Sequence, residues 1–354
     1  MSKPAILIVN PGPFGKLTDI YEYCQELKDE YSVTYYGFRE DEHPIPMPGI
    51  NMLHEFGHFK GIANRVKYIA NVYRLINRNQ YSKVWVIYFK GVSALLFKRT
   101  AINIDIRTGS VLQSSTINRI NNMIMRFETS AFKNVSIISE LLRLHLNIQR
   151  MAKVVPLGGR DYLQAPKVYN SFGINMIYVG TFFGRDIEST IKGFAGFLNS
   201  CHNPERHSYT IIGYGNAKDI DSINEEIEKY KMQKAIQYLG KIPYPFIDKF
   251  YLSHNIGLSY IPTEIKYEFQ PPTKTIEYLM NNLFVIGTST AANKELINKN
   301  NGIIIEADAQ SLELGLLRVN EQLENIDFVN IRINSNIHTW SEVVKKYVKP
   351  LLLN

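Results

Sequence analysis

The sequence contains few cysteines and no long apolar run. Its two cysteines, Cys24 and Cys201, lie in different halves of the chain, which argues against a disulfide framework or a cysteine-based zinc site. The first apolar run, Ala5 to Val9, is too short for a signal peptide, and no run reaches the roughly 18 residues of a membrane span. We therefore expect a cytoplasmic protein that meets a membrane, if at all, peripherally at its inner face.

Disorder is also excluded, because hydrophobic residues make up 45% of the chain and charged residues 21%. A length of 354 residues exceeds what one hydrophobic core usually supports, so two domains are expected.

Acidic residues are scarce in the first half. Residues 1–160 contain 21 Lys and Arg against 12 Asp and Glu, whereas residues 161–354 contain 19 against 21. Such an excess suggests an anionic partner, which could be a phosphorylated substrate, an anionic membrane surface or nucleic acid. A basic amphipathic helix expected over 60–79 could contact lipid headgroups, or it could simply bury its apolar face in the core. A basic surface kept for solubility is the alternative reading of the charge excess as a whole.

Short apolar runs alternate with segments of helical periodicity, which predicts an α/β fold with parallel sheets. The segment from Ala152 to Asp161, which contains Pro156 and a Gly pair, is a candidate inter-domain hinge. The pattern begins again after it, which predicts two Rossmann-like domains. We assign residues 1–158 to the first domain and 159–337 to the second, with a C-terminal helix over 338–354 crossing back to the first. The expected strands are 5–9, 31–38, 83–88, 101–106, 135–138, 174–180, 208–213, 235–239, 256–261, 283–286 and 302–305, and the main expected helices are 60–79, 116–133, 186–199, 219–232, 245–253, 272–281, 291–298 and 308–324.

Two glycine-containing loops follow strands of the second domain. Ligands of open parallel sheets bind beyond the carboxyl ends of the strands, so these loops are candidate sites. Gly180-Thr-Phe-Phe-Gly-Arg185 precedes a helix and could cradle a pyrophosphate with Arg185 nearby. Gly213-Tyr-Gly215 also permits close backbone approach. The alternative for both loops is an ordinary tight turn between strand and helix.

A third segment, Gln270 to Glu277, introduces a helix with two prolines. Lys274 and Glu277 are three residues apart and share one helix face. The cation could hold a nucleotide diphosphate and the carboxylate a ribose diol. The alternative is an exposed intrahelical salt bridge.

The order of these motifs resembles the C-terminal domain of glycosyltransferase family 4, the group 1 glycosyl transferases that include enzymes of polysaccharide biosynthesis. The resemblance rests on Ile211-Ile-Gly-Tyr-Gly215, Pro272-Thr-Lys-Thr-Ile-Glu-Tyr-Leu279, Phe284-Val-Ile-Gly-Thr288 and Asn301-Gly302. Ile104-Asp-Ile-Arg-Thr-Gly109 resembles the same family's N-terminal domain. The family implies a GT-B fold, in which two Rossmann-like domains face each other across a cleft.

The resemblance implies that Glu277 binds the ribose hydroxyls, that the backbone near Thr273 and Lys274 faces the diphosphate, and that Ile242 lies at the base. It also implies that the loops with Gly180, Gly213 and Gly215 surround the donor. The chain departs from the family pattern at two positions. Thr181 occupies the usual place of an Arg, which leaves Arg185 to stabilise the leaving diphosphate together with Lys274. Phe269 replaces the first Glu of the paired-Glu motif, and the neighbouring Glu268 could substitute only through a shifted loop.

In the first domain, the loop from Gly12 to Gly15 matches the position from which such enzymes approach the donor phosphates. We expect Asp105 and Arg107 to line the cleft as catalytic residues, because they follow a strand where the family often places a His. His54 and His58 are four apart, but no third ligand accompanies them, so we expect no metal site.

Taken together, these features predict a hexosyltransferase-like, metal-independent enzyme that moves a sugar from a UDP- or GDP-linked donor to a glycan or lipid-linked saccharide. The resemblance implies retention of configuration and a role in surface polysaccharide biosynthesis. Two alternatives remain open: a nucleotide-sugar epimerase of similar architecture, and a catalytically weakened nucleotide- or glycan-binding homologue. Nucleic-acid binding is the weakest alternative, because no nucleic-acid motif is present.

Overall fold

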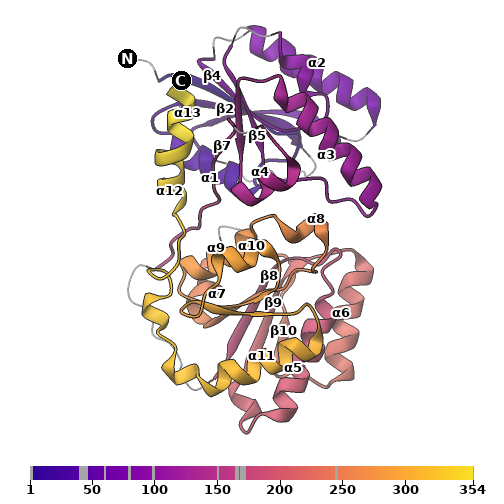
Figure 1. The fold of residues 1–354 in the computed structure, drawn as a ribbon, viewed down its shortest axis with the longest axis vertical. Helices are drawn as coiled ribbons and strands as arrows, with labels where there is room; N and C mark the ends of the chain where they lie inside the picture. Colours follow the sequence, from indigo (N-terminus) through magenta and orange to yellow (C-terminus); the bar gives the residue numbers. More distant parts are fainter. Residues whose placement is uncertain are drawn as a thin grey trace. The chain divides into compact units, whose positions relative to one another are not determined.

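The computed structural model describes residues 3–39, 47–59, 61–78, 81–97, 100–149, 151–163, 167, 173–243 and 246–353. The chain divides into two compact units. Unit 1 comprises Met1–Leu157 with Trp340–Asn354, and unit 2 comprises Gly158–Thr339. Each unit is an α/β layer structure around its own parallel sheet (Figure 1).

Unit 1 contains a seven-stranded sheet in the order β3-β2-β1-β4-β5-β6-β7, and every neighbouring pair is parallel. Its strands are β1 Ala5–Val9, β2 Ser32–Arg39, β3 Ile50–Phe56, β4 Lys83–Ile87, β5 Ile102–Ile106, β6 Asn134–Ile137 and β7 Lys153–Val154. Its helices before the C-terminal segment are α1 Thr18–Leu27, α2 Ile62–Arg78, α3 Ser115–Ser130 and α4 Glu140–Leu146, with the 3₁₀ turn η1 Val92–Leu95. The edge strand β3 has no counterpart among the expected strands.

Unit 2 repeats the arrangement with six parallel strands in the order β10-β9-β8-β11-β12-β13. The strands are β8 Asn175–Thr181, β9 Ser208–Tyr214, β10 Ile236–Tyr238, β11 Ile256–Ser259, β12 Phe284–Thr288 and β13 Gly302–Ile305. The helices are α5 Ile187–Ser200, α6 Ala217–Lys229, α7 Asp248–Ser253, α8 Ile265–Glu268, α9 Thr273–Met280, α10 Ala291–Leu296 and α11 Ala309–Glu321, with 3₁₀ turns η2 Pro204–Arg206, η4 Leu323–Asn325 and η5 Phe328–Asn330. Two Rossmann-like α/β units are therefore confirmed.

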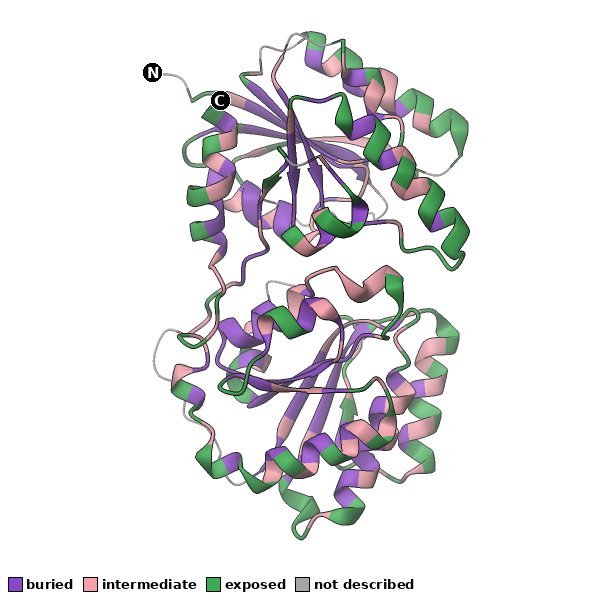
Figure 2. Cartoon of the chain, in the orientation of Figure 1, coloured by how far each residue is buried: buried purple, intermediate pink, exposed green. Residues whose placement is uncertain are grey.

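Local sequence explains where several helices begin and end. Ser139 caps α4 by accepting a hydrogen bond from the Leu142 N–H at 3.1 Å, and Asn147 ends it in the left-handed region at a φ of 51°. Asn216 and Asp219 form a capping box at the start of α6. The central strands β1, β4, β5, β11 and β12 are buried on both faces, as parallel sheets covered by helices require (Figure 2). The edge strands β3, β7 and β10 are partly exposed.

The chain returns to unit 1 at its C-terminus, as expected from the sequence. This segment consists of α12 Trp340–Val343, the π-helical turn η6 Val344–Val348 and α13 Lys349–Leu353. The Trp340 ring packs edge-on against Tyr23 of α1 at 6.1 Å, and Lys349 pairs with Glu30 at 2.7 Å. Within the described ranges, no helix combines the length and apolar character needed to cross a bilayer.

The expected helix over 60–79 corresponds to α2, although Lys60 and Asn79 lie outside the described residues. His54 belongs to β3 and His58 to the loop after it, so the two do not share a helix face.

Candidate functional site

The direction of the crossovers in unit 2 reverses between β8 and β11. β8 lies between β9 and β11, so the loops that follow β8 and β11 leave the sheet on opposite sides. In doubly wound sheets a crevice opens at such a switch point, beyond the carboxyl ends of the two strands. The loop Phe182–Asp186 follows β8, and α9 follows β11 after the short helix α8. The two segments singled out from the sequence therefore meet at the position where this fold binds ligands.

Helix α9 is held firmly against this sheet. The fully buried Thr275 hydroxyl lies 2.7 Å from the Ser259 hydroxyl and 2.9 Å from Asn293 Oδ1. The Tyr278 hydroxyl accepts the Val179 N–H at 2.8 Å. Gly257 makes room for the Tyr278 ring, because a Cβ there would lie 2.4 Å from it. These contacts fix the start of α9 relative to the end of β8.

Lys274, in the first turn of α9, carries its ammonium over an aromatic face. Its Nζ lies 3.8 Å from the centre of the Tyr178 ring. It also approaches the backbone of Gly180 so closely that a Cβ there would lie 2.9 Å from Nζ. Burial, reinforced by the nearby Arg185 guanidinium, lowers the pKa of Lys274 well below its ordinary value.

Arg185 lies in the loop after β8 and stacks on Tyr267 of α8, with its Cζ 4.0 Å from the ring centre. Its Nη1 is buried, and among the described residues it has no hydrogen-bond partner. No carboxylate of the described chain forms an ion pair with Arg185 or Lys274. Two neighbouring cations without a counter-charge make an anion-binding position.

Glu277 lies one turn further along α9 and is 5% exposed. Its Oε2 accepts a hydrogen bond from the Tyr251 hydroxyl of α7 at 2.8 Å. It forms no ion pair with Lys274, so the exposed intrahelical salt bridge considered from the sequence is absent. The carboxylate is instead a buried acceptor with a defined orientation.

Steric contacts within unit 2 explain why glycine occupies two of the predicted donor positions. Gly180 and Gly213 are neighbours in the β8–β9 register, and a Cβ on Gly213 would lie 1.8 Å from the Gly180 carbonyl oxygen. A Cβ on Gly215 would lie 2.6 Å from Asp219 Oδ2, inside the capping box of α6. The Gly180 backbone thus requires glycine at Gly213, and the Asp219 side chain leaves no room for a Cβ at Gly215, with or without a ligand.

The remaining predicted donor residues of unit 2 lie around the same end of the sheet. Thr181 ends β8, and its carbonyl accepts the Tyr178 hydroxyl at 2.8 Å. Thr273 opens α9 and is partly buried. Ile242 follows β10 and packs against the core of unit 2. Their roles toward a donor stay predictions.

Glu268 is engaged elsewhere in unit 2. Its Oε1 accepts a hydrogen bond from the Ala291 N–H at 2.9 Å, which ties the end of α8 to the start of α10. Phe269 follows as the last residue of the α8 turn. The Glu268 carboxylate, next to Phe269, therefore already forms a hydrogen bond that joins two helices of unit 2.

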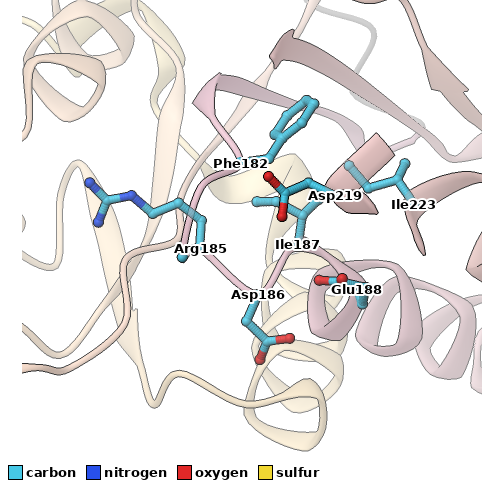
Figure 3. A pocket seen from close by; sticks show the side chains of 8 residues that line it. Phe182, Arg185, Asp186, Ile187, Glu188, Asp219 and Ile223 are labelled. Atoms are coloured by element: carbon cyan, nitrogen blue, oxygen red, sulfur yellow. The ribbon is translucent and has the colours of Figure 1, made fainter. Parts of the chain in front are cut away.

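A cavity of about 250 Å³ lies beside the start of α5, and Arg185 is one of its lining residues. Acidic side chains line it, namely Asp186, Glu188 and Asp219. Figure 3 shows the Arg185 side chain extending away from Asp219 and Ile223. Three of its four charged lining residues are acidic, which disfavours a diphosphate inside the cavity itself.

Unit 1 places the two other predicted catalytic residues in its interior. Asp105 is fully buried and accepts hydrogen bonds from Ser136 Oγ at 2.6 Å and Trp85 Nε1 at 3.2 Å. Arg107 donates from Nε to Asp19 Oδ2 at 2.6 Å, and its Nη1 lies 3.5 Å from Asp105 Oδ2.

The charge states of this group follow from its burial. Burial raises the pKa of Asp105, while the Arg107 charge opposes that rise. Burial alone would lower the pKa of Arg107, but Tyr23, Asp19 and Asp105 raise it, so the guanidinium stays charged. This geometry favours a structural role, and the catalytic role expected from the sequence remains a prediction.

The glycine loop after β1 is held by hydrogen bonds with Asn10 and with Tyr35 of β2. The Gly12 N–H donates to Asn10 Oδ1 at 3.1 Å, and the Tyr35 hydroxyl donates to the Gly12 carbonyl at 2.7 Å. Gly15 has a φ of 84°, which explains glycine at this position. The contribution of Gly12 and Gly15 to donor binding stays a prediction.

Sequence reasoning missed the aromatic residues of the site. Tyr178, Tyr267 and Tyr251 orient Lys274, Arg185 and Glu277, yet in the sequence each of them looks like ordinary core packing. The only available signal was the number of tyrosines, 22 in the chain.

Comparison with known proteins identifies the fold. No protein-family model matches the sequence, and curated proteins give no match. Among solved structures, a sucrose-phosphate synthase from Thermosynechococcus elongatus has a TM-score of 0.75 at 12% identity, with 98% of each chain covered. A glycosyltransferase from Rickettsia africae ESF-5 has a TM-score of 0.72 at 14% identity and full coverage of both chains.

Anabaena HepE in complex with UDP-glucose has a TM-score of 0.72 at 13% identity, covering 99% of this chain and 100% of that one. These neighbours are GT-B glycosyltransferases. The chain therefore has the GT-B fold, as the sequence resemblance implied.

Proposed function

We propose that the chain is a glycosyltransferase that moves a sugar from a nucleoside-diphosphate sugar to a hydroxyl of a glycan or lipid-linked saccharide. The observation that carries the proposal is the pair of cations, Arg185 and Lys274, at the switch point of unit 2, where no carboxylate of the described residues forms an ion pair with them. HepE, a structural neighbour, was solved with UDP-glucose. We include retention of configuration, independence of metal ions and a role in surface polysaccharide biosynthesis in this proposal, because the family resemblance implies them.

In the proposed reaction the bond between the anomeric carbon and the diphosphate oxygen breaks, and its electron pair stays with the diphosphate. A bond to the acceptor oxygen forms, and the acceptor hydroxyl passes its proton to the leaving diphosphate oxygen. Negative charge grows on the leaving diphosphate, where Arg185 and Lys274 stabilise it more strongly than in the ground state. Glu277 would accept the hydroxyl hydrogens of the ribose, which orients the donor.

The test is Arg185→Ala in the full-length chain. Because the Arg185 side chain makes no ion pair in the described structure, folding should be little affected. Binding of UDP or GDP, measured by calorimetry, should weaken about tenfold to a hundredfold, as expected for a charge-assisted contact. Arg318→Ala, at an exposed position on α11, is the matched control and should change nothing.

Product analysis separates the proposal from its alternatives. A transferase releases nucleoside diphosphate in proportion to acceptor glycosylation, whereas an epimerase converts the donor sugar without an acceptor. A binding homologue takes up the nucleotide sugar and releases neither product. Unchanged nucleotide affinity in Arg185→Ala would remove the basis of the proposal.

A further inference from the structure

Helix α3 in unit 1 turns its apolar side toward solvent. Ile117, Ile120, Met123 and Phe127 follow one another at intervals of three or four residues and form one stripe, which we call the α3 face. All four are exposed, Met123 by 64% and Phe127 by 79%. An ordinary surface helix shows the opposite arrangement, with its apolar stripe against the core.

The buried side of α3 is largely polar and specifically bonded. Asn118 Oδ1 accepts from Ser110 Oγ at 2.7 Å and from the Leu112 N–H at 2.9 Å. Glu128 accepts from the Tyr88 hydroxyl and the Gly91 N–H, both at 2.8 Å. Rotating the helix to bury the α3 face would break these bonds and leave a buried carboxylate unsatisfied. The outward orientation is therefore fixed by the fold.

Further apolar side chains lie on neighbouring elements. Phe97, directly after η1, is 85% exposed, and η1 packs against both α2 and α3. Ile62 and Val66 at the start of α2 are exposed as well. The rest of α2 buries its apolar face in the core, which was one of the two alternatives from the sequence, because Tyr68 and Val72 are buried. The exposed apolar area thus centres on α3 rather than on α2.

The charge of this region is of one sign. Arg119 and Arg126 are exposed on α3 beside the apolar stripe. Glu128, the one acidic residue of α3, is buried, and the sequence of α2 contains no acidic residue. Apolar side chains flanked by arginines suit the interface of an anionic bilayer, with the apolar groups at the acyl boundary and the guanidinium groups at the phosphates.

We propose that the α3 face docks onto an anionic membrane surface. The α3 face is separate from the cations of unit 2, and the proposal does not depend on sugar transfer. If both proposals hold, docking would bring the enzyme to an acceptor anchored in the same membrane.

The experiment is vesicle flotation with the full-length protein at physiological salt. We expect binding to vesicles of phosphatidylcholine with phosphatidylglycerol and little binding to phosphatidylcholine alone. Met123→Ser with Phe127→Ser should weaken binding at least about tenfold, because two large apolar groups no longer enter the interface. Arg119→Gln and Arg126→Gln should each weaken it about fivefold.

The matched control is Val329→Ser with Ile333→Ser, which removes two exposed apolar side chains from unit 2. It should float like the unaltered protein, and all variants should melt at the same temperature, since the altered side chains are exposed. Equal flotation of the α3 variant, or no flotation of the unaltered protein, overturns the proposal. So does a self-association, measured without lipid, that the α3 variant abolishes, because a second copy would then cover the face.

Discussion

The two units share a strand order, but the cations beyond the carboxyl ends of their strands have different partners. In unit 1, Arg107 lies between the carboxylates of Asp19 and Asp105. In unit 2, Arg185 and Lys274 lie over aromatic rings without a carboxylate partner in the described structure. One scaffold thus supports a self-neutralised ion group in unit 1 and, in unit 2, two cations that have no carboxylate partner among the described residues. The pattern of partners, rather than the presence of cations, indicates which end of a sheet is ready for a phosphate ligand.

The largest expected effect comes from breaking the ion group of unit 1. Arg107→Met leaves Asp19 and Asp105 buried near each other without a cation, so unfolding should become about 3–5 kcal/mol easier. Chemical denaturation followed by circular dichroism measures this. Nucleotide affinity of the folded protein should stay the same if Arg107 is structural. A stable variant with impaired nucleotide binding would instead support the catalytic role expected from the sequence.

Removing a cation from unit 2 should have the opposite effect: it should weaken nucleotide binding and leave stability intact. Lys274→Met eliminates a desolvated ammonium that has no counter-charge, so stability should stay equal or rise. Binding of UDP or GDP should weaken about tenfold to a hundredfold in calorimetry. Lys299→Met, at an exposed position after α10, is the control. Loss of stability without loss of affinity would contradict the anion-site interpretation.

The lowered pKa of Lys274 predicts how affinity changes with pH. A diphosphate binds the protonated ammonium better, so binding raises this pKa. Above the lowered pKa the free protein holds Lys274 neutral, and binding must take up a proton. Affinity should therefore fall as pH rises through that pKa, by at most about tenfold per pH unit. Titrations across a pH range in which the terminal phosphate of the nucleotide stays ionised measure it. Lys274→Met should show a flatter profile, and a slope equal to that of the unaltered protein would assign the proton elsewhere.

Much of the fold followed from the alternation of apolar strands with helical segments, because that pattern is local. The strand β3 was not predicted because it lies at the edge of the sheet. Its polar residues Asn51, His54 and Glu55 interrupt the apolar run that marks a buried strand. The helix α8 was missed because four residues carry too little periodicity.

The site was predictable only where position along the chain decides function. Arg185 and Lys274 were singled out as candidates because they follow strands of a parallel sheet. Arg107 also follows a strand, but Asp19, 88 residues earlier in α1, turns it inward, and no local pattern reveals that pairing. Long-range packing decides whether such a cation meets a ligand or a carboxylate of its own chain.

The smallest expected effect tests whether Glu277 and the cations bind different parts of one ligand. Tyr251→Phe keeps the ring, which packs against Tyr278 at 5.8 Å, but removes the hydroxyl that donates to Glu277 Oε2. Loss of this hydrogen bond should make the orientation of the Glu277 carboxylate less defined and weaken binding of UDP or GDP about twofold to tenfold.

Inorganic pyrophosphate gives the internal control for this variant, because it lacks a ribose. Tyr251→Phe should leave pyrophosphate affinity unchanged, whereas Lys274→Met should weaken binding of pyrophosphate and nucleotide alike. Calorimetry of both ligands against both variants gives the four affinities. Equal losses for pyrophosphate and nucleotide in Tyr251→Phe would mean that the hydroxyl supports α9 as a whole, and the assignment of Glu277 to the ribose would fail.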